Sequence, residues 1–518
     1  MKTFVQRHQD QILGVLSGFD RLRFRGVLRL LQSEGGTATW LERVGVAVKD
    51  FLKFAEGLTK RLCRGMDQLA QEAGRKARYL PGVVDKEELV QEIRGKEGVA
   101  DNGLVAVLKT QEMGMSYTMF RSRGFSVLRR GPRKCNHYYC YWEDERFGLM
   151  HVRMSSWFPF DVHVVLNGRE WLARQMDGAG IGYVRDDNCF PEVSDFARAQ
   201  ELADEQPQID WVGELDRVLR RVHPLHAEVF TGVGALDHYW TAEQTEWATD
   251  IVFRDAESLS RLYQRLVRHG IDTFQSPDVL RFLGHRMPAH GGINGQYEGD
   301  VMSDLKRRHE GVRIKHRGGK NSVKMYNKCP TLLRVETTMN DGQGLKVYRH
   351  SQADPEGPRQ WLNLRKSVAD LPRRAELSQA SNQRYLDALS SVTAETPLAE
   401  ITDRLCRPVS GDGRRHRGLQ PFDVDEVRLL QAVSRGEYLI SGVRNRDVRR
   451  ALFGEAQDPQ QRRREAGRVT RKLALLRAHG LIKKIPRTHR YLLTESGVKA
   501  ISAILAARQA SLSQLAAA

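Results

Sequence analysis

The strongest candidates for catalytic residues in this chain are carboxylates that lie in or beside apolar, strand-like segments. Asp250 begins an apolar segment, Glu336 lies inside another, and Glu246 and Asp300 are further candidates. Such segments rarely carry a lone carboxylate. Carboxylates that converge at strand ends can hold divalent cations for phosphodiester cleavage. The pattern predicts catalytic roles for Asp250 and Glu336, with Mg²⁺ as the cofactor if the protein is a nuclease.

Two other interpretations of these segments stay open. Lys324 and Arg334 could pair with the carboxylates, which would make the acidic residues structural. Tyr326 is a candidate nucleophile, because a tyrosine hydroxyl can form a covalent intermediate. The alternatives for Tyr326 are an ordinary sheet position or a ring that stacks on a base.

The positive charge of the chain is concentrated in two places. The net charge is +18, and residues 401–518 hold 24 basic and 11 acidic residues. Residues 301–330 hold 9 basic and 2 acidic residues, and the rest of the chain nets about −2. Concentrated charge favours a polyanion partner, DNA or RNA, over a solvated basic face. The middle cluster supplies the candidate contacts Lys306, Arg307, Arg308, Arg313, Lys315, Arg317, Lys320 and Lys324.

Aromatic and basic residues interleave in RRGPRKCNHYYCYW, residues 129–142. Bases stack on aromatic faces while Arg and Lys contact phosphates, so the segment favours single-stranded or structured nucleic acid. The alternative is an aromatic strand with its rings in the core. Zinc ligands are sparse, since Cys135 and Cys140 have no second pair. His151 and His163 are a possible split metal pair, but we predict no metal site from them.

Several protein classes are excluded by composition. A length of 518 residues suggests three or four units, and 40% hydrophobic residues can build cores. No apolar run is long enough to span a membrane, and the first residues lack a signal peptide's apolar core. Six cysteines are too few for a disulfide scaffold. Walker, triad and dinucleotide-binding motifs are absent. We therefore expect a cytoplasmic protein with reduced thiols and no membrane partner.

The hydrophobic periodicity predicts a multidomain α+β protein. Residues 1–98 form a helical N-terminal unit, including a helix in QDQILGVLSGFDRLRFRGVLRLLQ. Residues 99–205 form an α+β domain. Residues 206–407 form a second α+β domain with basic strands in 301–340 and a helical extension. Residues 408–422 form a polar, Gly- and Arg-rich linker, and residues 423–518 form the C-terminal domain.

The C-terminal segment has the most specific pattern. Two helices, a long basic helix ended by Gly480, a short hairpin and a last helix follow one another. In the long helix, Val469, Leu473 and Leu476 recur at helical spacing, which predicts one buried stripe. This order, and the phrase LLRAHGLIKKIPRTHRYLLTESG, resembles the winged helix–turn–helix domain of MarR-like regulators. The resemblance implies a recognition helix in the major groove and a wing on the backbone. The candidate contacts are Arg464, Arg468, Arg471, Lys472, Arg487, His489 and Arg490.

Two further resemblances concern the rest of the chain. The YNK and LRVE phrases near Tyr326 are similar to plasmid and filamentous-phage replication initiation proteins, although the His-hydrophobic-His pair of rolling-circle initiators is missing. Phrases such as NGREWLARQMDGAGIGYVRDDNCF resemble uncharacterised bacterial proteins labelled MarR-like, which suggests a mobile genetic element.

These observations favour a nucleic-acid-binding protein with bipartite contacts, in replication initiation or in a ribonucleoprotein. One alternative is a metal-dependent, transposase-like or replication-type nuclease, and another is a transcriptional regulator. The sequence does not distinguish DNA from RNA and does not set the oligomeric state.

Overall fold

The computed structural model describes residues 2–82, 84–98, 102–122, 124–226, 236–285, 301–308, 311–351, 353–390, 398–411, 414–436, 438, 442–455, 458–486 and 488–511. The chain divides into two compact units, each built from separate segments. Unit 1 holds residues 1–14, 251–335 and 380–518, and unit 2 holds residues 15–250 and 336–379. The consecutive domain boundaries expected from the sequence stay predictions. Among the described residues, no helix combines the length and apolar character needed to cross a membrane.

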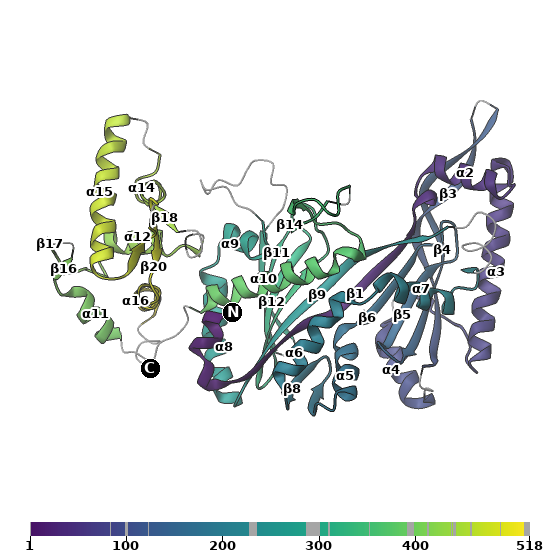
Figure 1. Ribbon diagram of the computed structural model, residues 1–518, viewed down its shortest axis with the longest axis horizontal. Helices are drawn as coiled ribbons and strands as arrows, with labels where there is room; N and C mark the ends of the chain where they lie inside the picture. The colour runs from purple at the N-terminus through teal and green to yellow at the C-terminus, as the bar shows by residue number, and fades with distance from the viewer. Residues whose placement is uncertain are drawn as a thin grey trace. The chain divides into compact units, whose positions relative to one another are not determined.

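Runs of strands and runs of helices follow one another along the chain, as expected for a protein of mixed α and β structure (Figure 1). Unit 2 contains all or most of β1 (Ile12–Leu28), α2 (Glu34–Arg43), α3 (Phe51–Glu72), β2 (Arg78–Tyr79), α4 (Lys86–Glu97), β3 (Leu104–Ser122), β4 (Phe125–Asp144), β5 (Gly148–Ser155), β6 (Val162–Asn167), α5 (Gly168–Gly178), β7 (Tyr183–Asp186), β8 (Cys189–Val193), α6 (Phe196–Glu205), α7 (Trp211–Val222), β9 (His238–Phe253), β14 (Lys346–Arg349) and β15 (Gln360–Asn363). β13 (Leu332–Met339) and α10 (Leu371–Leu389) contribute residues to both units.

Unit 1 contains shorter elements and the C-terminal region. These are α1 (Lys2–Arg7), α8 (Ala256–Asp272), α9 (Ser276–Phe282), β10 (Val301–Arg308), β11 (Gly311–Gly318), β12 (Asn321–Cys329), α11 (Leu398–Cys406), β16 (Val409–Gly411), β17 (Arg414–His416), α12 (Val424–Val433), β18 (Val443–Arg444), α14 (Asn445–Phe453), α15 (Pro459–Ala478), β19 (Ile482–Lys484), β20 (Arg490–Leu493) and α16 (Glu495–Gln509).

A large sheet is the main architectural feature. Within the described residues, its eleven strands have the order β10-β11-β12-β13-β9-β1-β6-β5-β4-β3-β2. The strands predicted in 99–205 and in 301–340 are confirmed. The long strands β1 and β9 lie side by side near the middle of this order.

The helix predicted over residues 9–32 is wrong, because most of this segment is the strand β1. From Arg21 to Arg25, arginines alternate with buried Leu22 and Phe24. This period of two is that of a strand with one buried face. The apolar residues before Asp20 also fit a helical stripe, but sheet neighbours on both sides, β9 and β6, decide the conformation. The segment 2–98 is therefore only partly helical, mainly through α1, α2, α3 and α4.

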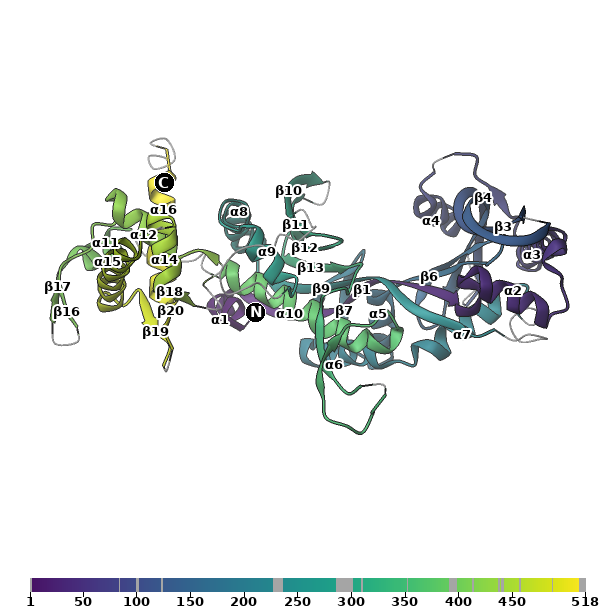
Figure 2. The ribbon, with the colours of Figure 1, turned by 90° about the horizontal axis from the view of Figure 1, so that it is seen from above.

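Helices cover both faces of the sheet in unit 2. Leu62 of α3 belongs to the same core as Val107 of β3. Val90 of α4 belongs to a second core with Leu108, the next residue of β3. Successive strand residues point to opposite faces, so α3 and α4 cover opposite faces, as Figure 2 shows.

The C-terminal elements follow the order expected from the sequence. α12, β18, α14 and α15 precede the hairpin β19–β20, and the small sheet has the order β18-β20-β19. The predicted stripe of Val469, Leu473 and Leu476 on α15 is buried in the hydrophobic core that the C-terminal elements share. Arg449 of α14 pairs with Glu465 of α15 at 3.2 Å, which holds the two helices together.

The segment predicted as a linker, residues 408–422, contains structure. β16 and β17 form a two-stranded antiparallel hairpin in which Val409 lies opposite His416. The Gly- and Arg-rich composition that indicated a linker is equally compatible with two short paired strands.

Candidate functional site

Three carboxylates gather on three neighbouring strands of unit 2. Asp20 comes from β1, Glu246 from β9 and Glu336 from β13, and one carboxylate oxygen from each lies within 4.8 Å of the others. Only 5% of Asp20 and 2% of Glu336 are exposed, and Glu246 is half-buried. Because β13, β9 and β1 are consecutive in the sheet, one residue of each strand can project to the same face.

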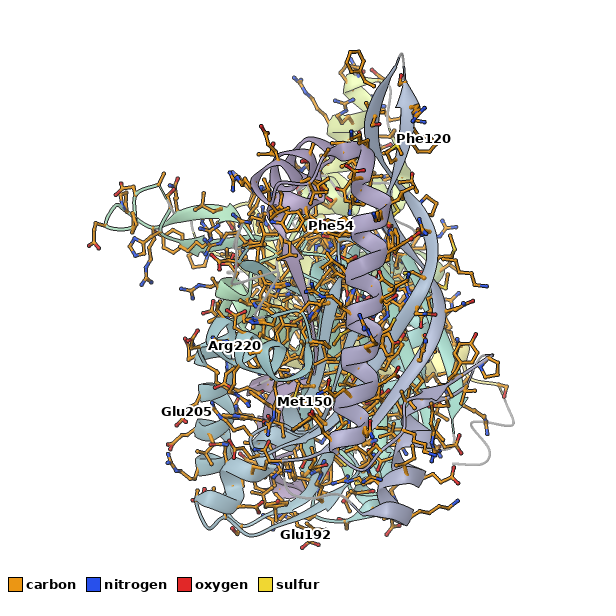
Figure 3. All side chains as sticks on the ribbon, turned by 90° about the vertical axis from the view of Figure 1, so that its right-hand side faces the viewer. Phe54, Phe120, Met150, Glu192, Glu205 and Arg220 are labelled. Atoms are coloured by element: carbon orange, nitrogen blue, oxygen red, sulfur yellow. The ribbon has the colours of Figure 1, made fainter. Side chains whose placement is uncertain are left out.

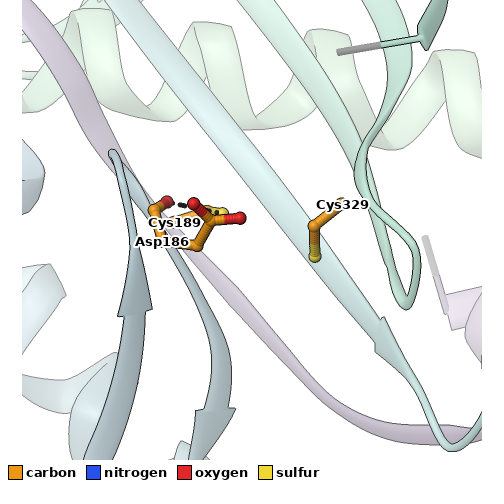
Figure 4. A group of neighbouring side chains, drawn as sticks. All are labelled: Asp186, Cys189 and Cys329. Atoms are coloured by element: carbon orange, nitrogen blue, oxygen red, sulfur yellow. Dashed lines mark hydrogen bonds between the residues drawn. The ribbon is translucent and has the colours of Figure 1, made fainter.

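The β7–β8 hairpin supplies a fourth polar group to this cluster. The side-chain amide of Asn188, in the turn, donates hydrogen bonds to both carboxylate oxygens of Asp20 at 2.7 and 2.8 Å. Figure 4 shows the neighbouring Asp186 and Cys189, where the thiol donates to the backbone oxygen of Asp186 at 3.1 Å. Cys329, drawn in the same figure, belongs to the other compact unit. The side-chain amide of Asn188 thus fixes the plane of the Asp20 carboxylate.

An arrangement of three carboxylates suits one kind of ligand. Hard divalent cations such as Mg²⁺ and Mn²⁺ prefer oxygen donors, and carboxylates supply charge as well. A hydrogen-bond donor that orients a ligating carboxylate raises its affinity for the cation, and the Asn188 amide has this position beside Asp20. Asp20, Glu246 and Glu336 are therefore the residues that could hold a divalent cation.

Asp250 lies elsewhere on the same strand as Glu246. Its Oδ2 atom is 3.1 Å from a terminal guanidinium nitrogen of Arg169, and the two side chains are 1% and 0% exposed. Arg169 also donates to the backbone oxygen of Ala248 at 3.0 Å. This environment favours a structural role for Asp250. Asp300, the other acidic candidate, lies outside the described residues.

The cysteine and histidine candidates do not form a metal site, because they lie apart or contact other side chains. Cys135 and Cys140 are five positions apart on β4, so they point to opposite faces. His163 lies 3.0 Å from the carboxylate of Glu243, which also pairs with Arg23 at 2.7 Å. Burial lowers the pKa of His151 to about 3. An arginine beside the His163–Glu243 pair disfavours a cation there.

One face of the strands β10, β11 and β12 carries cations at regular spacing. Lys315 lies directly opposite Lys324, and Lys306 lies opposite Arg313. The cations on this face are Lys306, Arg313, Lys315, Arg317 and Lys324, and we call it the basic face. It also carries one acidic residue, Asp304, which lies opposite Lys315 and 3.6 Å from Lys306. On β11 and β12 the opposite face is buried and carries Ile314, His316, Val323 and Met325. The sheet's own pleat therefore gathers the positive charge on one side.

The electrostatics of the basic face are unfavourable in the absence of an anion. Burial and the positive charges of Lys324, Arg317 and Arg313 lower the pKa of Lys315, although Asp304 opposes them. Like charges directly opposite each other destabilise a sheet. Within the described part of the chain, neither Arg313 nor Lys315 forms an ion pair. An anionic ligand would remove this repulsion.

The remaining central candidates have different positions. Arg307 lies opposite Val312, on the other face of β10 from Lys306. The backbone of Arg308 lies opposite Gly311. Lys320 is exposed in the turn between β11 and β12. Tyr326 lies opposite Arg313 and is only 9% exposed, so a reacting phosphate would need the surrounding side chains to move.

The C-terminal candidates lie mostly at the surface. Arg464, Arg468 and Arg471 are exposed on α15, and Lys472 is half-buried beside them. His489 is exposed before β20 and Arg490 is half-buried. Arg487 lies outside the described residues.

Comparison with known proteins identifies no family for the chain. No family model matches the chain, and no curated protein or solved structure is significantly similar to it.

The sequence indicated part of the carboxylate cluster. It named Glu246 and Glu336, and it missed Asp20 and Asn188. The alternation of arginines with Leu22 and Phe24 was the available signal, since it defines β1 as a strand and puts Asp20 on a strand face. No local pattern could have identified Asn188, because its role depends on where the β7–β8 turn lies in the folded chain.

Proposed function

We propose that the protein binds nucleic acid through the basic face and through its C-terminal region. The observation that carries the proposal is the ladder of cations in which Lys315 lies opposite Lys324, flanked on its own strand by Arg313 and Arg317. Burial and these cations lower the pKa of Lys315, although Asp304 opposes them, and a polyanion would add negative charge beside the basic face.

The C-terminal region supports the same proposal. Its order of helices and strands and its sheet order β18-β20-β19 are those expected for a winged helix–turn–helix domain. The exposed arginines of α15 would then lie on the recognition helix, and the β19–β20 hairpin would be the wing. Contacts from both regions would make binding bipartite.

The test uses the full chain and fluorescence anisotropy with duplex and single-stranded oligonucleotides of DNA and RNA. The triple variant Arg313→Gln, Lys315→Gln and Arg317→Gln removes three cations from the basic face. A matched variant changes the exposed Lys49, Lys53 and Lys60 of the α3 region to Gln. We expect the basic-face variant to weaken binding and to reduce the slope of log affinity against log salt for duplex by about 2–3. Equal affinities and slopes for the two variants would contradict the proposal.

A second candidate function, metal-dependent cleavage of a nucleic-acid backbone, is favoured by the Asp20–Glu246–Glu336 cluster. A divalent cation bound by these carboxylates would polarise a phosphoryl oxygen and lower the pKa of a bound water. The chain's own contribution would be the ligand set and the orientation of Asp20 by Asn188.

Two measurements test this candidate. Mn²⁺ binding to the full chain is followed by electron paramagnetic resonance, and strand cleavage is followed with supercoiled and single-stranded substrates. Glu336→Gln should abolish both, whereas Asp50→Asn, at an exposed position, should leave both unchanged. Wild-type protein that binds no Mn²⁺ would exclude this function.

A further inference from the structure

The hairpin of β3 and β4 extends well beyond the strands that flank it. Its register runs without interruption from Ala106 opposite Tyr141 to Ser122 opposite Phe125. β4 pairs with β5 only from His137 onward. The distal residues are therefore a two-stranded ribbon that projects past α2 and α3 (Figure 1).

The base of this ribbon is fixed to unit 2. The hydroxyl of Tyr117 donates to the backbone oxygen of Leu31 at 2.8 Å. Arg130 donates to the backbone oxygen of Gln32 at 2.9 Å, and its own N–H donates to Glu34 at 2.9 Å. A bare two-stranded ribbon is marginally stable in water, so these anchors define how its tip is presented.

The tip exposes aromatic surface. Phe125 is 75% exposed, Phe120 is 47% exposed, and Val127, opposite Phe120, is 42% exposed. Figure 3 shows Phe120 on the projecting part of the hairpin. Clustered apolar side chains on a projecting element indicate a binding surface.

Charge identifies the class of partner. Residues 113–134 contain six basic residues and no acidic one. The guanidinium of Arg129 lies 5.5 Å from the centre of the Phe120 ring. Exposed rings flanked by arginines suit single-stranded nucleic acid, because rings stack on unpaired bases and arginines contact phosphates.

We propose that the tip of the β3–β4 hairpin binds unpaired bases of a nucleic acid. Phe120 and Phe125 stack on bases, and Arg121 and Arg129 contact the adjoining phosphates. The proposal rests on the proposed nucleic-acid binding and adds a third contact that is specific for single strands.

The experiment compares Phe120→Ala/Phe125→Ala with the matched control Phe422→Ala, which removes a 51% exposed ring from unit 1. Anisotropy is measured with a thymidine oligonucleotide and with a duplex. We expect the double variant to lose about tenfold or more in affinity for the single strand. Duplex affinity should stay unchanged, and the control should match the wild type.

Photocrosslinking gives an independent readout. A 5-iodouracil-substituted oligonucleotide should crosslink to the tryptic peptide Gly124–Arg129, which contains Phe125. Unchanged single-strand affinity of the double variant, or crosslinks only outside the hairpin, would overturn the proposal. If the basic-face variant still loses affinity in that case, the proposed function stands and only the hairpin assignment fails.

A membrane or protein partner would give a different result. If the double variant loses binding to vesicles containing phosphatidylglycerol, or loses self-association, while its affinity for the oligonucleotide is unchanged, the tip serves that partner and not nucleic acid. Wild-type protein that binds no oligonucleotide would overturn both proposals.

Discussion

Arg169 and Asp250 form an ion pair at 3.1 Å with almost no exposure of either side chain. The two residues come from α5 and β9, so the pair joins a helix to the sheet that it covers. Two charges buried together are costly to separate, because the remaining charge has no water to solvate it. This relationship distinguishes Asp250 from the carboxylate cluster, which includes Glu246 of the same strand.

Replacing Asp250 by Asn should destabilise the fold without removing divalent-cation binding. We expect a loss of about 3–5 kcal/mol in the free energy of unfolding, because Arg169 stays buried with a neutral neighbour. Denaturant titration measures the loss, and Asp50→Asn, at an exposed position, is the control. A stable variant that no longer binds Mn²⁺ would instead make Asp250 a ligand.

Replacing Asn188 by Ala should weaken Mn²⁺ binding by about 10- to 100-fold, because the Asp20 carboxylate loses the amide that orients it. A titration with Mn²⁺ followed by electron paramagnetic resonance checks this. Asn188→Asp is the informative contrast, since it adds a fourth carboxylate beside Asp20. Mn²⁺ should raise the melting temperature of this variant more than that of the wild type, and an equal rise would argue against cation binding at Asp20.

His316 should make the fold sensitive to acid. It is buried between Ser303, at 2.7 Å, and Tyr385, at 3.1 Å. Burial lowers its pKa from 6.5 to about 4. The folded state therefore disfavours the protonated ring, so the stabilisation is complete above pH 6.5 and is lost as pH falls from 6.5 towards 4. The loss is about 3 kcal/mol for this group.

The comparison of His316→Gln with the wild type checks this pH dependence. The free energy of unfolding should fall less steeply between pH 7 and pH 4 in the variant than in the wild type. As a control, substitution of the exposed His350 should give the same pH dependence of this free energy as in the wild type. Parallel curves for His316→Gln and the wild type would show that other groups control acid stability.

Changing Arg464, Arg468 and Arg471 together to Gln should reduce affinity for duplex and reduce the magnitude of its salt slope by about 2–3. These side chains are exposed, so the melting temperature should change little. Affinity for single strands should fall less than affinity for duplex. An equal loss for both forms would mean that α15 provides general electrostatic attraction and no groove contact.

The sequence predicted elements best where one periodicity prevailed. The stripe of Val469, Leu473 and Leu476 predicted a buried helix face, and all three are buried. The segment before Asp20 was ambiguous, because its apolar residues fit a helical stripe as well as a strand. Pairing with β9 and β6 made it a strand, and such long-range pairing has no local signature. The error concealed Asp20 as a site residue.

For the basic residues, the sequence likewise predicted the region but not the face of the sheet on which each side chain lies. Their number in 301–330 indicated a polyanion surface, but only the register separates Lys306 from Arg307. One step along a strand changes the face. The carboxylate cluster likewise required the sheet order, since Glu246 and Glu336 lie 90 positions apart in the chain.

The carboxylate cluster has a consequence for the newly made chain. Its most distant members, Asp20 and Glu336, are 316 positions apart in the chain. Closing so long a loop costs entropy that local contacts cannot offset. A nascent or truncated chain that ends before β13 would therefore lack Glu336, and the three carboxylates could come together only after β13 has been translated and has joined the sheet.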